Sequence, residues 1–385
     1  MHPLPPPQFL YVHVNKRCNL RCGHCDFWQM DDADSERYVQ GERMRELLAE
    51  FAELNPQGRV VICGGESMLD LDRYFHITTT CRALGLRALS VVNGTRIRDE
   101  AMAERMVREG PHEVSVSLNS HRAELHDRTR GVAGAFDKSV QALRLLLAAR
   151  RRLGADDIRI HVMGLIFDEN YRELEPFHDF VLNDVGADKL KLNFLQPSFG
   201  HGGDMDAFFV QHHRVDADEL AEVIERCDQR FALGLNPAFK SQAVMYFRSL
   251  AGVPDLARGW GASARTTEHI CNTYERNIMV DHHGVARLCF ATIFPGMPLR
   301  QRGDLARFWH IAQPVREAMR SCNRLCGISH SVRRETSTLA SWRAPQALRA
   351  TGSLSSPVDS AVPSTMTAPH RIIQLVTASD RNSAP

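Results

Sequence analysis

Three cysteines occur within eight residues near the start of the chain, in the segment RCNLRCGHCDFW (17–28). Cys18, Cys22 and Cys25 have the spacing C-x3-C-x2-C, and thiolates bind both zinc and iron–sulfur clusters. A structural zinc site normally has four ligands, and His24 would have to fold back over its own turn to become the fourth. A [4Fe–4S] cluster held by three thiolates leaves one iron free to bind a small molecule. The spacing therefore favours an open iron–sulfur cluster.

A second set of cysteines lies later in the chain. Cys271 and Cys289 follow the pattern C-x12-G-x4-C, in which Gly284 is expected to turn a hairpin so that both cysteines face one site. Cys322 and Cys326 come next as C-x3-C. Four thiolates saturate one [4Fe–4S] cluster, but they also complete a structural zinc site. From the residues alone, both possibilities stay open.

The other soft ligands are expected to be structural. Cys63, Cys81 and Cys227 lie on strand or helix patterns, where cysteine usually acts as a buried small hydrophobe. His282 and His283 lie in the turn of the hairpin, which is expected to be solvated.

Short β-branched runs alternate along the chain with segments whose apolar residues lie three and four positions apart, the helical pattern. Near-continuously apolar strands alternating with helices favour a parallel sheet, and six repeats predict an α/β fold, an open or partial (β/α)6 barrel. Chemistry in such barrels lies at the C-terminal ends of the strands, where the three-cysteine loop falls. The candidate strands are residues 9–14, 59–63, 89–92, 113–118, 158–167 and 189–195.

Changes in pattern and composition divide the chain into three parts. Residues 1–225 are expected to form the barrel. Residues 226–334 include the hairpin NIMVDHHGVARLC and are expected to form a small, separate, cysteine-containing domain. Residues 335–385 are rich in Ser, Thr, Ala and Pro, and are expected to be a disordered tail because they cannot bury enough apolar surface to offset their ordering entropy.

The bulk composition argues against several classes of function. A formal net charge of +1 gives no reason to expect nucleic acid or a membrane surface as a partner. No apolar run is long enough to span a bilayer, and the N-terminus lacks the features of a secretion signal. The ten cysteines are therefore expected to stay reduced in the cytoplasm, where clustered thiols indicate metal binding.

The cysteine loop and three later motifs resemble those of the radical S-adenosylmethionine (radical SAM) superfamily. CNLRCGHC (18–25) resembles the family's cluster-binding loop, and CGGES (63–67) resembles its GGEP motif, with Ser67 in place of proline. VNGT (92–95) is similar to the family's TNG, and SVSLNSHRAELHDRTRGVAGAF (115–136) is similar to its fourth-strand segment.

The resemblance implies that Cys18, Cys22 and Cys25 bind a [4Fe–4S] cluster whose fourth iron binds SAM. In the family, electron transfer from the reduced cluster cleaves SAM to a 5′-deoxyadenosyl radical, which abstracts a hydrogen atom from the substrate. A reducing partner such as a flavodoxin or ferredoxin is implied as well.

The resemblance also implies contacts with SAM. The two glycines of CGGES let the backbone approach the SAM amino group, and His24 takes the place of an aromatic residue that contacts the adenine. Ser117 and Asn119 would face the ribose and carboxylate, although many relatives have Asp at the second position. Arg130 is expected either to pair with the SAM carboxylate or to cap its own loop. The implied cofactor-binding residues are His24, Gly64, Gly65, Glu66, Asn93, Ser117, Asn119 and Arg130.

The later cysteines resemble the SPASM/Twitch extension that follows many radical SAM barrels. Four cysteines suit the one-cluster Twitch form, with Cys271, Cys289, Cys322 and Cys326 as the implied ligands of an auxiliary [4Fe–4S] cluster. A saturated cluster has no iron free for substrate, so its expected task is electron transfer. This implies an oxidative, dehydrogenation-type reaction.

The substrate is expected to be a small molecule such as a sugar or aminocyclitol. Modification of a peptide is an alternative, and a third possibility is a non-catalytic iron–sulfur or zinc protein. The loop QPSFGHGGDMD (196–206), with His201 and Asp204, is expected either to line the mouth of the barrel or to be a plain surface loop.

Overall fold

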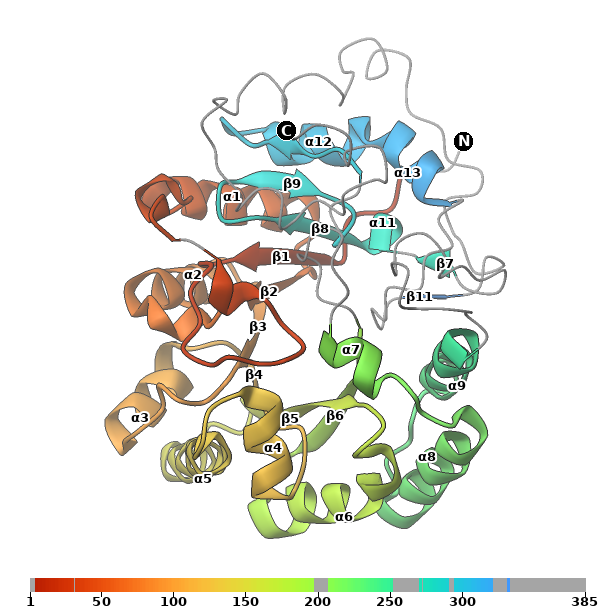
Figure 1. Ribbon diagram of the computed structural model, residues 1–385. Coiled ribbons are helices and arrows are strands. Elements are labelled where there is room, and N and C mark those ends of the chain that lie inside the picture. The colour runs from red at the N-terminus through yellow and green to blue at the C-terminus, as the bar shows by residue number, and fades with distance from the viewer. Residues whose placement is uncertain are drawn as a thin grey trace, which may run out of the picture.

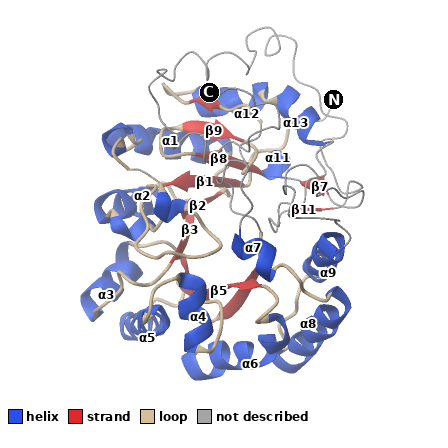
Figure 2. Ribbon diagram, viewed as in Figure 1, coloured by secondary structure: helices blue, strands red, loops and turns tan. Residues whose placement is uncertain are grey.

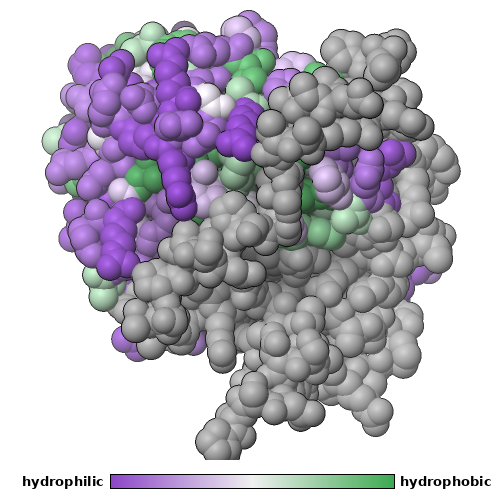
Figure 3. Space-filling view, turned by 90° about the horizontal axis from the view of Figure 1, so that it is seen from above, coloured by the Kyte–Doolittle hydropathy of each residue, from purple (hydrophilic) through white to green (hydrophobic). Residues whose placement is uncertain are grey.

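The computed structural model shows an α/β chain whose curved sheet is covered by helices on its outer side (Figures 1 and 2). The residues described by the structure are 4–30, 32–196, 207–251, 270–271, 273–290, 294–320 and 331–332. Within these ranges, no helix is both long and apolar enough to cross a membrane. Seen from above, the described surface is mostly hydrophilic, with a few apolar side chains between the polar ones (Figure 3).

Six strands of the barrel lie side by side in chain order, and each pairs in parallel with the next. The expected α/β fold with a partial parallel barrel is therefore confirmed, and the strand limits differ from the predicted ones by no more than two residues. The strands are β1 (Phe9–His13), β2 (Arg59–Cys63), β3 (Arg87–Val92), β4 (Glu113–Ser117), β5 (Arg159–Ile166) and β6 (Lys189–Phe194).

Helices connect these strands and cover the outer side of the sheet (Figure 1). They are α1 (Gly41–Leu54), α2 (Leu71–Ala83), α3 (Glu100–Glu109), α4 (Ala123–Arg130), α5 (Ala135–Leu153) and α6 (Leu174–Asp179). Three further helices follow β6: α7 (Ala207–His212), α8 (Ala217–Phe231) and α9 (Pro237–Ala251). Shorter helical turns are η1 (Phe27–Gln29), η2 (Ser35–Arg37), η3 (Ser67–Leu69), η4 (Tyr171–Glu173) and the π-helical η5 (Phe180–Val185).

The strands bury alternate side chains beneath the helices. In β1, Leu10 and Val12 have no exposed surface and belong to the same core as Leu47 of α1. Tyr11 and His13, the alternate residues, are only half-buried because successive side chains of a strand point to opposite faces. One face of the sheet is thus packed, and the other remains available for polar groups.

The hairpin predicted around Gly284 is present, but it extends the barrel sheet instead of forming a sheet of its own. β8 (Asn277–Val280) pairs in parallel with β1, and β9 (Val285–Arg287) and β10 (Met297–Pro298) follow in antiparallel pairings. The result is a nine-stranded sheet. The other described elements of this region are β7 (Ile270–Cys271), α11 (Thr273–Arg276), α12 (Asp304–Ile311), α13 (Gln313–Arg320) and β11 (Ser331–Val332).

The boundary expected between residues 225 and 226 falls inside α8. Leu220, Val223, Ile224 and Cys227 of this helix are all buried, so one continuous apolar stripe crosses the expected boundary. The auxiliary domain over 226–334 remains a prediction. The tail over 335–385 and the loop over 197–206, with His201 and Asp204, lie outside the described residues.

The expectation of a solvated turn at His282 and His283 was wrong. His282 is 3% exposed, and its backbone oxygen accepts a hydrogen bond from the Val39 N–H at 2.9 Å. The His283 Nε2 atom lies 3.0 Å from Asp34 Oδ2. Because β8 pairs with β1, the turn packs against the segment that follows β1. Cys81 and Cys227 are buried as expected, whereas Cys63 is only half-buried.

Candidate functional site

The three-cysteine loop follows β1 and lies at the C-terminal end of the barrel strands. Cys22 is buried, and Cys18 and Cys25 are half-buried. The three side chains pack with Leu20 and Ala135 in a small apolar cluster separate from the main core. The Cys25 N–H donates to Cys22 O at 3.3 Å, which closes a turn. The loop therefore holds three thiols together at the mouth of the barrel.

The C-terminal end of α4 anchors one side of this loop. The Arg21 N–H donates to Arg130 O at 3.0 Å, and the Gly23 N–H donates to Thr129 O at 3.2 Å. The last carbonyls of a helix lack hydrogen-bond donors within the helix, and here the N–H groups of the loop act as those donors. Gly131 follows with φ +66°, and a Cβ atom there would lie only 2.1 Å from Arg21 O. This close approach explains why glycine follows Arg130 at the end of α4.

The Gly-Gly pair after β2 anchors the other side. The Gly65 N–H donates to Asn15 O at 3.0 Å, and the Glu66 N–H donates to Arg17 O at 2.7 Å. A Cβ atom on Gly65 would lie 2.0 Å from Arg17 O, and Gly64 has φ +125°. The glycines thus allow two backbone segments to touch, so their first visible role is to hold the cysteine loop.

The Glu66 carboxylate joins the ends of two strands. It accepts hydrogen bonds from the Asn93 N–H at 2.7 Å and the Met68 N–H at 3.1 Å. The residue is 2% exposed, and burial raises the pKa of its carboxyl group to about 7. Because both carboxylate oxygens accept hydrogen bonds from backbone N–H groups, Glu66 links the end of β2 to the end of β3.

A polar network links the end of β3 to the cysteine loop. Asn93 Nδ2 donates to Asn19 Oδ1 at 2.8 Å, and Asn19 Nδ2 donates to Thr95 Oγ1 at 2.7 Å. Asn93 Oδ1 accepts from the Thr95 N–H at 3.0 Å. Asn19 and Thr95 were not predicted as site residues. They lie inside the motifs CNLRCGHC and VNGT, but no sequence pattern showed that the two motifs would meet.

Arg130 connects the cysteine loop to the end of β4. Its Nη1 lies 3.7 Å from Cys22 Sγ, and its Nη2 lies 3.3 Å from Asn119 Oδ1. Asn119 also donates through Nδ2 to Thr129 Oγ1 at 3.0 Å. Arg130 Nε is buried without a partner in the described part of the chain. Ser117 ends β4 and is half-buried.

His24 lies on the loop between the second and third cysteines. Its Nδ1 is buried and lacks a hydrogen-bond partner within the described ranges. Burial and the nearby Arg130 guanidinium lower the pKa of His24 to about 3, so the ring is neutral. Its centroid lies 5.9 Å from that of Phe208 in α7, a contact that links the loop to a helix almost two hundred residues away.

Asp168, Glu169 and His212 form a cluster that sequence patterns did not indicate. His212 Nδ1 lies 2.9 Å from Asp168 Oδ1 and 3.2 Å from Glu169 Oε1. Their ligand atoms all lie within 4.8 Å of one another, a donor set able to hold a metal ion. Glu169 also pairs with Arg128 of α4, which already balances part of its charge. The cluster ties α7 to the end of β5.

The donor set suits an iron–sulfur cluster with a small ligand. Burial raises the pKa of Cys18 to about 11 and raises that of Cys25 as well, so iron must displace their protons on binding. Arg130 offers a positive charge to the resulting thiolates. Arg130 Nε and His24 Nδ1, which have no hydrogen-bond partner among the described residues, could bind a further ligand beside the three thiols.

The auxiliary cysteines are described only in part. Cys289 is buried and lies just after β9. Cys271 belongs to β7, whose backbone pairs with β11 through Ser331. Cys322 and Cys326 lie outside the described residues, so the predicted four-cysteine set remains a prediction.

The chain thus combines a partial parallel barrel with three clustered thiols at the C-terminal ends of its strands, a donor set able to bind an iron–sulfur cluster. Residues 12–181 match the model of the radical SAM superfamily, and the chain therefore carries a radical SAM domain. The family implies a [4Fe–4S] cluster and SAM as its cofactors.

Known proteins similar to this chain differ in what they act on. An AdoMet-dependent heme synthase from Oleidesulfovibrio alaskensis is 32% identical over 150 residues, 38% of this chain and 36% of that protein. The antilisterial bacteriocin subtilosin biosynthesis protein AlbA of Bacillus subtilis is 25% identical over 226 residues, 57% of this chain and 45% of that protein. The chain spans 36% to 54% of the length of the first curated relatives that it matches.

Among solved structures, the fold is similar to that of Streptococcus suis SuiB bound to the precursor peptide SuiA. The TM-score is 0.57 at 13% identity, and the match covers 83% of this chain and 67% of SuiB. At this identity the likeness supports the fold.

Proposed function

We propose that the chain is a radical SAM enzyme, in which Cys18, Cys22 and Cys25 hold the SAM-binding [4Fe–4S] cluster. When bound, cluster and SAM together supply an electron and a 5′-deoxyadenosyl radical that abstracts a hydrogen atom from the substrate. The observation that carries this proposal is the arrangement of three thiols on one loop, held between α4 and the Gly-Gly turn, with the Arg130 guanidinium 3.7 Å from Cys22 Sγ.

The chain's own residues would bind and orient SAM. Arg130, fixed by Asn119, offers its remaining N–H groups to a carboxylate. His24 presents a neutral ring for the adenine, and Ser117 lies at the end of the neighbouring strand β4. Gly64, Gly65, Glu66 and Asn93 would act mainly by positioning the loops, because they link the ends of β2 and β3 to each other and to residues 15–19.

The type of reaction is proposed from the resemblance of the later cysteines to the SPASM/Twitch extension. Cys271, Cys289, Cys322 and Cys326 would hold one auxiliary [4Fe–4S] cluster that accepts an electron from the substrate radical, which makes the net reaction an oxidation. A flavodoxin or ferredoxin would reduce the first cluster. Reduced thiols suit the cytoplasm as the compartment.

Two classes of substrate are proposed. The sugar or aminocyclitol expected from the sequence draws no support from the names of the relatives. A peptide is favoured by the 25% identity to AlbA over 226 residues, since that protein's name places it in the biosynthesis of a bacteriocin. We therefore take a peptide as the leading candidate and a small molecule as the second.

The decisive experiment is an assay of SAM cleavage by anaerobically reconstituted, dithionite-reduced protein. We expect 5′-deoxyadenosine from the wild-type chain and none from a variant in which Cys18, Cys22 and Cys25 are all replaced by serine. Iron should fall from about eight to about four atoms per chain in that variant, since one of two clusters is lost. Full iron content without any 5′-deoxyadenosine would favour the non-catalytic alternative.

A further inference from the structure

β6 is the last strand at one end of the nine-stranded sheet. It pairs with β5, and within the described ranges no strand pairs with its other edge. A strand at the edge of a sheet presents unpaired N–H and C=O groups that another extended chain can pair with. β6 has six residues and therefore offers an edge about 20 Å long.

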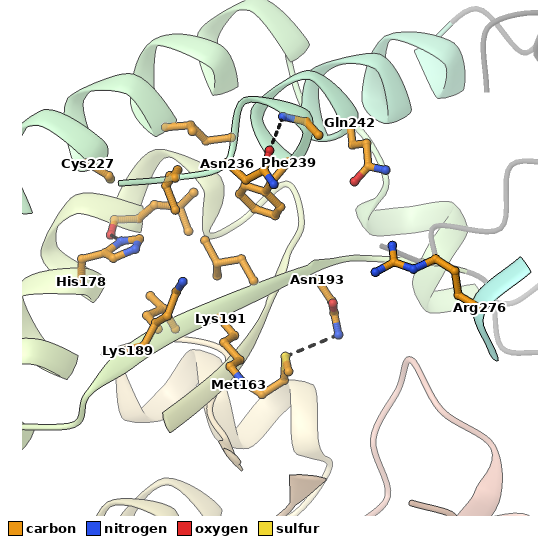
Figure 4. Close-up of a pocket in the computed structure, with 16 residues that line it drawn as sticks. Met163, His178, Lys189, Lys191, Asn193, Cys227, Asn236, Phe239, Gln242 and Arg276 are labelled. Carbon is orange, nitrogen blue, oxygen red and sulfur yellow. Dashed lines mark hydrogen bonds between the residues drawn. The ribbon is translucent and has the colours of Figure 1, made fainter. Parts of the chain in front are cut away.

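A cavity of about 460 Å³ lies along this strand, between β6 and the helices α8 and α9 (Figure 4). Its apolar wall includes Leu190 and Leu192 of β6, Ile224 of α8 and Phe239 of α9. An apolar wall beside an open strand edge suits the alternate side chains of an extended peptide, because successive side chains of a strand point to opposite faces.

The lysine and arginine residues that line the cavity carry positive charge. Lys189, Lys191 and Arg276 all line it, and no aspartate or glutamate is among the described residues that do. Lys189 is exposed, and Lys191 pairs with Glu113 across the sheet. Arg276 Nε donates to Gln8 Oε1 at 2.8 Å, and Figure 4 shows its guanidinium directed toward the strand. Charge complementarity therefore selects an acidic occupant.

We propose that the edge of β6 binds an extended, acidic peptide segment as an added strand. Because Lys191 is already paired with Glu113, Lys189 and Arg276 would attract the acidic side chains, and an acidic residue of a paired strand would lie beside Lys189. The carboxyl end of β6 opens at the same edge of the sheet as the cysteine loop after β1, because both strands run parallel. A segment bound along β6 would thus lead a peptide toward the candidate SAM site, which deepens, and rests on, the proposal of a peptide substrate.

The test uses the full chain with its clusters reconstituted, and three fluorescent eight-residue peptides. The first alternates glutamate with valine, the second alternates lysine with valine, and the third is the glutamate peptide with N-methyl groups at alternate backbone positions. By fluorescence anisotropy, we expect only the first peptide to bind well, and its affinity to fall with added salt. N-methylation should weaken binding at least about tenfold, because it removes the donors that pair with a strand edge.

Charge variants locate the binding site. Lys189→Glu should weaken binding of the glutamate peptide about tenfold, and Lys189→Gln about threefold, in line with the loss or reversal of one ion pair. Lys138→Glu, an exposed lysine of α5 on another part of the fold, is the matched control and should leave the affinity unchanged.

The inference is overturned by no binding of the glutamate peptide, by equal binding of its N-methylated form, or by equal affinity in Lys189→Glu. Competition by glutarate as strong as that of the peptide also overturns it, since the site would then recognise a small carboxylate. Formation of 5′-deoxyadenosine is measured in the same samples. Peptide binding without SAM cleavage contradicts the proposed function but not this inference. SAM cleavage without peptide binding supports the proposed function and contradicts this inference.

Discussion

The Arg130 guanidinium lies against the Cys22 thiol, with 3.7 Å between Nη1 and Sγ, while Nη2 reaches Asn119 Oδ1 at 3.3 Å. Arg130 is 7% exposed, so its charge is poorly screened by water. The backbone carbonyl of the same residue accepts the Arg21 N–H of the cysteine loop. One residue thus fixes the loop with its backbone and sets the local charge with its side chain.

Replacing Arg130 by glutamine should keep the backbone anchor and remove the charge. We expect SAM to bind about 10- to 100-fold more weakly, because a hydrogen bond to a charged group contributes about 1.5–3 kcal/mol. The reduction potential of the cluster should become more negative, since a nearby cation favours the reduced form. Calorimetric SAM titration and anaerobic redox titration measure the two effects. Arg128→Gln, an exposed arginine of the same helix, is the control, and identical behaviour of both variants would contradict the assignment.

Gly65→Ala should disrupt the cysteine loop. The added Cβ would lie 2.0 Å from Arg17 O, a backbone atom that cannot swing away. We expect the variant to lose several kcal/mol of stability and to retain iron poorly at the first site. Gly85→Ala is the matched control: its Cβ meets nothing within 4 Å, and its φ of +70° alone should cost about 1 kcal/mol. Urea unfolding and iron content compare the two. Equal iron retention would contradict the close-packing argument.

Glu66 should make the iron-free chain less stable as pH rises. Burial raises the pKa of this carboxyl from its usual 4.5 to about 7, so the folded chain holds the proton more tightly than the unfolded chain. The stabilising effect of that proton is present below pH 4.5 and is lost as pH rises through 7. Wild type should lose about 2 kcal/mol of unfolding free energy between about pH 5 and pH 8 that Glu66→Gln does not lose, because glutamine does not ionise. Urea unfolding at both pH values measures the difference.

Glu66→Ala separates charge from hydrogen bonding. It leaves the buried Asn93 and Met68 N–H groups without an acceptor, which should cost about 1–3 kcal/mol each at either pH. If the Gln and Ala variants were equally stable at pH 8, the hydrogen bonds by which residue 66 links β2 and β3 would not be important for the fold.

The auxiliary cysteines give a prediction that is independent of the first cluster. Serine at Cys271, Cys289, Cys322 and Cys326 together should lower the iron content from about eight to about four atoms per chain, while SAM cleavage persists. Cys81→Ala, which removes a buried thiol of α2, should leave the iron content unchanged. Zinc in place of the missing iron in wild-type protein would point to a structural zinc site instead.

By itself, the sequence determined the strands of the barrel and the chemistry of the first loop. Near-continuous apolar runs specify buried parallel strands because such strands are covered by packing, and this local signal placed all six within two residues of their limits. The spacing of Cys18, Cys22 and Cys25 indicated an open cluster because the three lie within one short loop, so that no distant contact is needed to bring them together.

Only the tertiary structure decided which segments meet. Asn19 bonds Asn93 across 74 residues, and β8 pairs with β1 across more than 260, which buries His282 in a turn that looked solvated. Such contacts depend on how helices and strands pack and leave no periodicity in the local sequence. The same reason hid the edge of β6 and its basic cavity: a strand's hydrophobic pattern indicates that it is buried, but the chain's topology decides whether a neighbour completes its hydrogen bonds.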